Sequence, residues 1–313
     1  MTRERVRELL GQAERMPYGA AKTAVLEQAM AHADAAHLDE LSFQARMLCT
    51  NAYVYGGEPA RSVVTFSWCL AEHDRDPERY RRWHHTLLWH FKYMVLAMFK
   101  VPEVSLARTE AVLDEMERRY RETGHGANAV YQYRHLVAEH VGDLAAAQDW
   151  FDRWRVTPAD PLSDCAGCTP SGQARWLHQV DRDEEAVRLA EPVLAAPPTC
   201  SEQPQNLLTT LLVPYLRTGR AERAGDAHRR GYLLIRSNLS DLADIGEHAR
   251  FCARTGNQAR ALEIVQRHLP WLDRAPSPYA AMHFAASAAL ALRLAGPVTV
   301  FRPEHADRPG AEL

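Results

Sequence analysis

The sequence predicts an all-α protein, a right-handed solenoid of stacked antiparallel helical hairpins with about 13–15 helices. Apolar residues recur at helical spacing along most of the chain, and no segment shows the alternation of a half-buried strand. Short corners recur at a nearly constant step, and a small residue follows each corner at a fixed distance. Such a period is typical of hairpins that bury their faces only against their neighbours.

The four clearest corners each contain a residue that favours a tight turn, namely Gly142, Asp181, Gly219 and Gly256. Successive steps between them are 39, 38 and 37 residues. Five residues after each of them lies an alanine: Ala147, Ala186, Ala224 and Ala261. We expect these alanines to let the second helix of each hairpin lie close against the first.

We expect helices near residues 2–15, 19–37, 39–55, 59–73, 79–99, 103–122, 127–141, 143–155, 170–180, 183–194, 203–217, 220–235, 240–254, 257–269 and 278–294. Further corners at Gly56–Pro59 and Lys100–Glu103 continue the repeat upstream in a less regular form. The sequence thus predicts one helical-repeat domain over 1–295, with a less regular half (1–125) and clearer repeats (126–295). Residues 296–313 are expected to form a flexible tail, in which Val298–Phe301 is a candidate short extended segment.

Composition narrows the classes of partner. The formal net charge is −3, and residues 1–38 hold five basic and five acidic side chains, so a nucleic-acid partner is not expected. The N-terminus has no signal-peptide core, and the most apolar stretch, Leu87–Phe99, is interrupted by His90 and Lys92. We expect a soluble cytoplasmic protein without a membrane partner. The prevalence of arginine and alanine suggests a bacterial genome of high GC content.

Three segments carry a resemblance to a known family. They are Ala174–Leu177 with Asp183–Ala186, Leu212–Leu216 with Gly219–Ala224, and Phe251–Gly256 with Ala259–Leu262. Together they resemble the tetratricopeptide-repeat superfamily, although the period here exceeds the usual ~34 residues. The chain also resembles uncharacterised bacterial members with a Ser-Asp-Cys-x-x-Cys segment. The resemblance implies a scaffold that binds proteins or peptides, and it carries over no catalytic residue.

The sharpest chemical feature is a group of cysteines at Cys165, Cys168 and Cys200. Cys-x-x-Cys spacing lets two thiolates chelate one metal ion, and all three cysteines precede the first helices of adjacent repeats, which are neighbours in a stack. We therefore expect a structural zinc site with Asp164 or His125 as the fourth ligand. The alternatives are reduced cysteines that cap or pack at a repeat junction, and a redox Cys-x-x-Cys pair.

A helix rich in aromatic and histidine residues is the candidate partner surface. Trp89, His90 and Tyr93 could line a groove that Tyr131 and Arg134 of a later helix extend, since aromatic and arginine side chains commonly anchor partners. The alternative is a central buried helix, because apolar groups lie on all its sides.

No phosphate-binding loop, nucleophile elbow or His-Glu-x-x-His pair occurs in the sequence, so an enzyme is not expected. The leading interpretation is a non-catalytic intracellular adaptor for a protein or peptide, with zinc joining two repeats. The alternative is a regulatory receptor whose peptide or small-molecule ligand sits in an aromatic-lined groove. A metalloenzyme that uses the cysteine site is a third hypothesis.

Overall fold

A computed structural model describes residues 3–198 and 200–297, and throughout these ranges the chain is all-α. It divides into two compact units, Met1–Ser163 (unit 1) and Asp164–Leu313 (unit 2). The proposed extended segment Val298–Phe301, and the tail from residue 298 on, lie outside the described residues.

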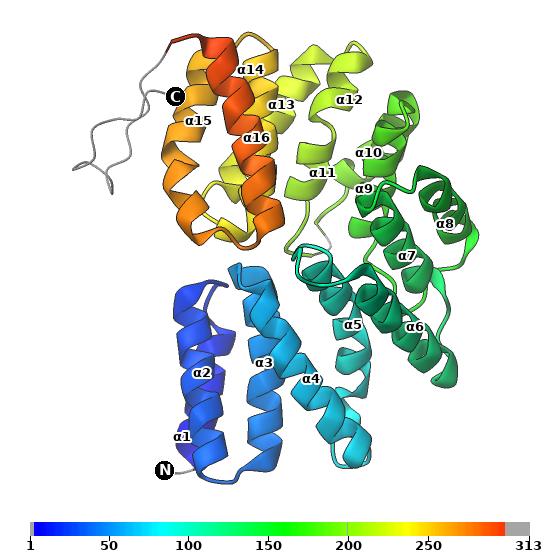
Figure 1. Ribbon diagram of the computed structural model, residues 1–313, viewed down its shortest axis with the longest axis vertical. Helices are drawn as coiled ribbons and strands as arrows, with labels where there is room; N and C mark the ends of the chain where they lie inside the picture. The colour runs from blue at the N-terminus through cyan, green and yellow to red at the C-terminus, as the bar shows by residue number, and fades with distance from the viewer. Residues whose placement is uncertain (1–2, 199, 298–313) are drawn as a thin grey trace, which may run out of the picture. The chain divides into compact units, whose positions relative to one another are not determined.

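Unit 1 consists of eight α-helices and one 3₁₀ turn within its described part (Figure 1). Each helix packs against the next one in sequence. The elements are α1 (Arg3–Glu14), α2 (Ala20–Ala35), α3 (Asp39–Gly56), α4 (Pro59–Arg75), η1 (Arg81–Trp83), α5 (His84–Met98), α6 (Leu106–Glu122), α7 (Asn128–His140) and α8 (Leu144–Val156).

Unit 2 continues with consecutive helix pairs (Figure 1). The elements are α9 (Cys168–Gln179), α10 (Asp183–Ala195), α11 (Gln205–Thr210), α12 (Leu212–Arg217), α13 (Ala221–Ile235), η2 (Leu239–Asp241), α14 (Leu242–Arg254), α15 (Gln258–His268), η3 (Leu269–Arg274) and α16 (Pro278–Ala295). Equivalent helices of successive pairs also meet, since α9 packs against α11 and α14 against α16.

The predicted corners share one backbone geometry. Gly142, Asp181, Gly219 and Gly256 all have positive φ, between 59° and 81°. The residue after each corner donates its N–H to a carbonyl five residues back, as Asp143 does to Ala138 at 3.0 Å. This is the Schellman ending of a helix, which satisfies carbonyls left without a helical partner. Unit 1 repeats the same ending at His37, Gly57 and Gly124.

The alanines that follow the four corners are completely buried, as the hairpin interpretation requires. Helix positions also follow the prediction, with two main differences. The expected helix over 79–99 begins with a turn and η1, and α5 starts only at His84. The expected helix over 203–217 is two helices, α11 and α12, that meet at Leu211. Pro214 explains the division, because it has no N–H to donate to the carbonyl of Thr210 and its ring crowds that carbonyl. Sixteen α-helices therefore result within the described chain.

A large aromatic and aliphatic core fills unit 1, with Phe43, Tyr80 and Phe91 among its buried members. The ammonium of Lys92 lies inside the same unit, where it donates to the Leu162 carbonyl at 2.9 Å and lies 3.1 Å from the centroid of the Trp89 ring. These contacts explain how a lysine that is only 1% exposed is tolerated, because a buried charge requires hydrogen-bonding partners. Across the described residues, none of the helices combines the length and apolarity needed to cross a membrane.

Candidate metal centre

Three cysteines of unit 2 converge where two neighbouring helix pairs begin. Cys165 lies in the loop before α9, Cys168 is the first residue of α9, and Cys200 lies in the loop that leads to α11. Because α9 and α11 pack against each other, their N-terminal loops are brought together. The repeat interpretation predicts this convergence, although Cys200 lies 32 residues after Cys168.

The Cys200 sulfur is in direct contact with the other two sulfurs. Cys200 Sγ lies 3.5 Å from Cys165 Sγ and 3.4 Å from Cys168 Sγ. All three are free thiols, and among the described residues they form the one group whose potential ligand atoms all lie within 4.8 Å of one another. Thiolates around a tetrahedral zinc lie about 3.8 Å apart, because each Zn–S bond is about 2.3 Å long. The sulfurs therefore need to separate by only a few tenths of an ångström to hold such an ion.

Each sulfur also accepts a hydrogen bond from an N–H group. The backbone N–H of Cys168 donates to Cys165 at 3.4 Å, and the backbone N–H of Glu202 donates to Cys200. The side-chain amide of Gln203 lies 3.8 Å from Cys168 Sγ. N–H donors stabilise a thiolate more than a neutral thiol, so these contacts favour the form of cysteine that binds metal.

Burial favours the protonated form of two of the three thiols. Burial raises the pKa of the Cys168 thiol far above its ordinary value, and the neighbouring Cys200 adds to the effect. Burial likewise raises the pKa of Cys200. A cation would supply the positive charge that this environment lacks, so its binding would release protons. Such burial disfavours an exposed, reactive redox thiolate.

The fourth ligand stays a prediction, with Asp164 and His125 as the two candidates. Asp164 precedes Cys165 directly but is not among the ligand atoms that gather within 4.8 Å. His125 belongs to unit 1, where its Nδ1 lies 3.2 Å from Asp160 Oδ2. Asp160 also accepts the backbone N–H of Gly126 at 2.9 Å, so that His125 is part of a loop anchor.

Gln203 is the neighbour that sequence reasoning missed. Its side chain is 5% exposed, and its Oε1 has no hydrogen-bond partner within the described structure. A glutamine close to a cysteine motif is too common a sequence feature to single out. Only the turn over residues 200–204, just before α11, brings its amide to the sulfurs.

The residues proposed for a partner groove fall into two groups. In the first, on α5, Trp89 Nε1 donates to the Tyr93 hydroxyl, which also hydrogen-bonds to Tyr55 at 2.9 Å. His90 of the same helix is fully buried, its Nε2 lies 3.0 Å from Asn51 Oδ1, and burial lowers its pKa to about 3. His90 is therefore a core residue, whereas Trp89 and Tyr93 are half-buried.

The second group lies on α7 and α8. Tyr131 stacks on Trp150 with 5.6 Å between the ring centroids, and Arg153 lies over the same indole at 4.6 Å. Arg134 contacts Trp150 as well and forms ion pairs at 2.7 Å with Asp114 and Glu117. Tyr131, Arg134 and Trp150 are half-buried, so this group forms an aromatic and basic surface.

The other cysteines, Cys49, Cys69 and Cys252, are buried in helices, and burial raises their thiol pKa values. Comparison with known proteins assigns no family, since no family profile matches the chain and no curated protein matches its sequence.

Proposed function

We propose that this protein is a non-catalytic scaffold of the tetratricopeptide-like type, which works in the cytoplasm and binds a protein or peptide. In this proposal its hairpins stack as a right-handed solenoid, and a structural zinc ion joins two of them at Cys165, Cys168 and Cys200. The observation that carries the proposal is the contact among three thiols from the starts of two successive helix pairs.

Two features support the solenoid. Helices pack mainly on their neighbours in sequence, and equivalent helices of successive pairs meet in unit 2. The corners share one Schellman geometry, so that each pair repeats the turn of the last. In such an array every unit is stabilised by its neighbours, and the resulting surface is suited to binding rather than to catalysis.

The donor set supports zinc. Three thiolates are ligands that zinc favours, and a structural site is completed by a fourth ligand. When bound, the ion would tie the loop before α9 to the loop before α11 and would neutralise thiolate charge. The protein's own contribution is the set of N–H donors to the sulfurs, which orients the ligands before the ion arrives.

The surface on α7 and α8 supports a protein or peptide partner. Trp150 and Tyr131 expose part of a stacked aromatic pair, and Arg153 and Arg134 surround it. Half-buried aromatic rings beside arginines provide large contact areas with little loss of conformational entropy, which is the usual composition of an interface hot spot.

The test is purification of the tagged protein from its own cell, at native expression and without chelator, followed by metal analysis and mass spectrometry. The proposal expects about one zinc ion per chain and one stoichiometric protein partner. Trp150→Ala should lose the partner and keep the metal, whereas Cys168→Ser should lose the metal.

Two outcomes would count against parts of this proposal. A zinc content below about 0.2 equivalents per chain would contradict the proposed zinc site. Retention of a peptide or small molecule in native mass spectra, in place of a protein, would instead favour the regulatory receptor. In that case Trp89 and Tyr93 would become the first residues to substitute.

A further inference from the structure

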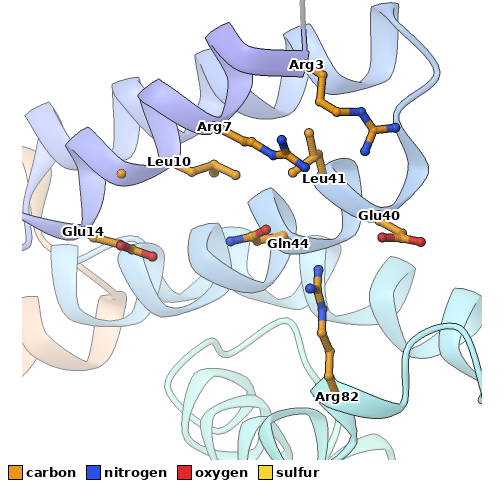
Figure 2. Close-up of a pocket in the computed structure, with 9 residues that line it drawn as sticks. Arg3, Arg7, Leu10, Glu14, Glu40, Leu41, Gln44 and Arg82 are labelled. Atoms are coloured by element: carbon orange, nitrogen blue, oxygen red, sulfur yellow. The ribbon is translucent and has the colours of Figure 1, made fainter.

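A pocket of about 310 Å³ in unit 1 is lined by residues from α1, α3 and η1 (Figure 2). Leu10 and Leu41 are buried beneath it, and Gln44 contributes a half-buried amide. Three arginines and two glutamates complete the polar lining: Arg3, Arg7, Arg82, Glu14 and Glu40. Figure 2 shows the Arg7 and Arg82 side chains reaching toward this space from α1 and η1, on opposite sides of it.

The three arginines differ from most others in the protein. Many arginines form ion pairs, and Arg5 of the same helix contacts Glu8 at 3.0 Å. Within the described residues, no carboxylate lies within ion-pair distance of Arg3, Arg7 or Arg82. Arg3 and Arg7 are four residues apart on α1 and therefore share a face, where like charges repel. All three arginines are exposed, and Arg82 also lies 5.4 Å from the centroid of the Trp83 ring. An anion in the pocket would offset the repulsion between Arg3 and Arg7.

Gly11 keeps part of the pocket open. A glycine inside a helix is unfavourable, and it is usually explained by a close neighbour that leaves no room for a side chain. A Cβ atom at Gly11 would meet only the end of the Arg15 side chain, at 3.9 Å. Packing therefore does not require this glycine. It lines the pocket one turn after Arg7, where the missing side chain leaves the space open.

We propose that this pocket binds a phosphomonoester. A phosphate carries up to two negative charges and three terminal oxygens, so it can accept hydrogen bonds from three separate guanidinium groups, whereas one arginine fork satisfies a carboxylate. The two glutamates reduce the formal charge of the lining to +1, which disfavours a polyphosphate or nucleic acid. They can also accept hydrogen bonds from hydroxyl or amino groups beside the phosphate.

The phosphate can belong to a small metabolite or to a phosphorylated side chain. Isothermal titration calorimetry of the full chain with glycerol 3-phosphate and with a short phosphoserine peptide distinguishes these sources, and the unphosphorylated peptide is the control. Tighter binding of glycerol 3-phosphate assigns a free metabolite, and tighter binding of the phosphopeptide assigns a modified protein segment. Absence of saturable binding by both probes overturns the proposal.

Four variants separate the pocket from general charge attraction. Arg7→Gln and Arg82→Gln each remove one guanidinium and should weaken binding about tenfold or more. Gly11→Leu keeps every charge, improves helix propensity and fills the space, so it should also weaken binding. Arg5→Gln removes an equal charge outside the pocket and should bind as the unaltered protein does. Equal affinity across all four variants, or full affinity in Gly11→Leu, would overturn the proposal whatever the fate of the zinc site.

Discussion

The cysteine cluster of unit 2 gathers three thiols, and the pocket of unit 1 gathers three guanidinium groups. The two sites differ in the charge of these groups and in the space between them. In the cluster, neutral thiols touch at 3.4–3.5 Å, so the space among them suits a single atom. In the pocket, permanent charges lie around about 310 Å³, a space that suits a polyatomic ion. Burial raises the pKa of Cys168 and Cys200, so binding of a cation would release protons from them, whereas guanidinium groups are always charged and an anion would offset their mutual repulsion.

The elements that supply each site differ as well. Loops at the starts of two successive helix pairs supply the thiols, and regular repetition keeps those starts adjacent. The faces of α1 and α3, together with η1, supply the pocket. A regular repeat thus brings loop residues into contact, while a less regular helical region leaves a space between helix faces.

The largest expected effect is loss of the metal. Cys168→Ser should abolish zinc binding and make stability insensitive to chelator, whereas chelator should destabilise the unaltered protein by about 4 kcal/mol when free zinc exceeds the dissociation constant a thousandfold. Thermal unfolding with and without chelator measures the difference. Cys49→Ala, which alters a buried cysteine of α3, is the matched control and should retain the zinc.

Acid should weaken both units through histidines that burial keeps neutral. In unit 2, burial lowers the pKa of His248 to about 3 and those of His228 and His268 to about 4, while it raises the pKa of Asp241 to about 8, which opposes the effect of one histidine. In unit 1, burial lowers the pKa of His90 to about 3 and also lowers those of His73, His84 and His140. Between about pH 4 and the unfolded-state pKa of about 6.5, the unfolded chain binds more protons than the folded one. Stability is therefore greatest above this window and falls with pH, by at most about 1.4 kcal/mol per pH unit for each histidine.

Hydrogen exchange at pH 7 and pH 5, resolved by peptide, measures the loss of protection in each unit. His248→Gln keeps a hydrogen-bonding group near Thr209 but cannot take up the proton, so it should flatten the pH response of unit 2. Unchanged protection of both units at pH 5 would contradict the prediction.

Two glycine substitutions should change stability in opposite directions. Gly11→Ala in unit 1 should raise the free energy of unfolding by about 0.5–1 kcal/mol, because the new methyl group meets no packed neighbour. Gly231→Ala in unit 2 should lower it, because its Cβ would lie 3.1 Å from His248 Cε1 and 3.3 Å from Leu208 Cβ. Chemical denaturation compares both with the unaltered protein. Destabilisation by Gly11→Ala would show that packing, not open space, retains that glycine.

The smallest expected effects are on stability without ligand, and they differ between Arg5, which has an ion pair, and Arg7, which has none among the described residues. Arg7→Gln should leave stability unchanged or raise it by about 0.2–0.5 kcal/mol, because it removes repulsion from Arg3. Arg5→Gln should lower it by a similar amount, since Arg5 loses its pair with Glu8. Denaturation curves for both variants, recorded at low salt, test the difference in sign. Marked destabilisation by Arg7→Gln would mean that Arg7 has a structural partner.

Much of the fold could be predicted from the sequence because its signals are local. Glycine or aspartate at a helix end favours positive φ, and apolar spacing marks helices, so the corners at Gly142, Asp181, Gly219 and Gly256 agree with the structure. The division between α11 and α12 also has a local cause, because Pro214 has no N–H group to donate within a helix. The contact among Cys165, Cys168 and Cys200 follows from the same regularity, since repeat arithmetic relates positions far apart in the chain.

The sequence by itself therefore determined the helices, their corners and the three metal-ligand candidates. Only the tertiary structure decided that His90 is buried, because a helix that is apolar all round has no face marked for solvent. It also decided that His125 contacts Asp160, and that Arg82 faces the same space as Arg3 and Arg7. These contacts join residues far apart in the sequence and depend on how particular helices pack. Packing is a sum of many weak contacts that no local sequence pattern encodes.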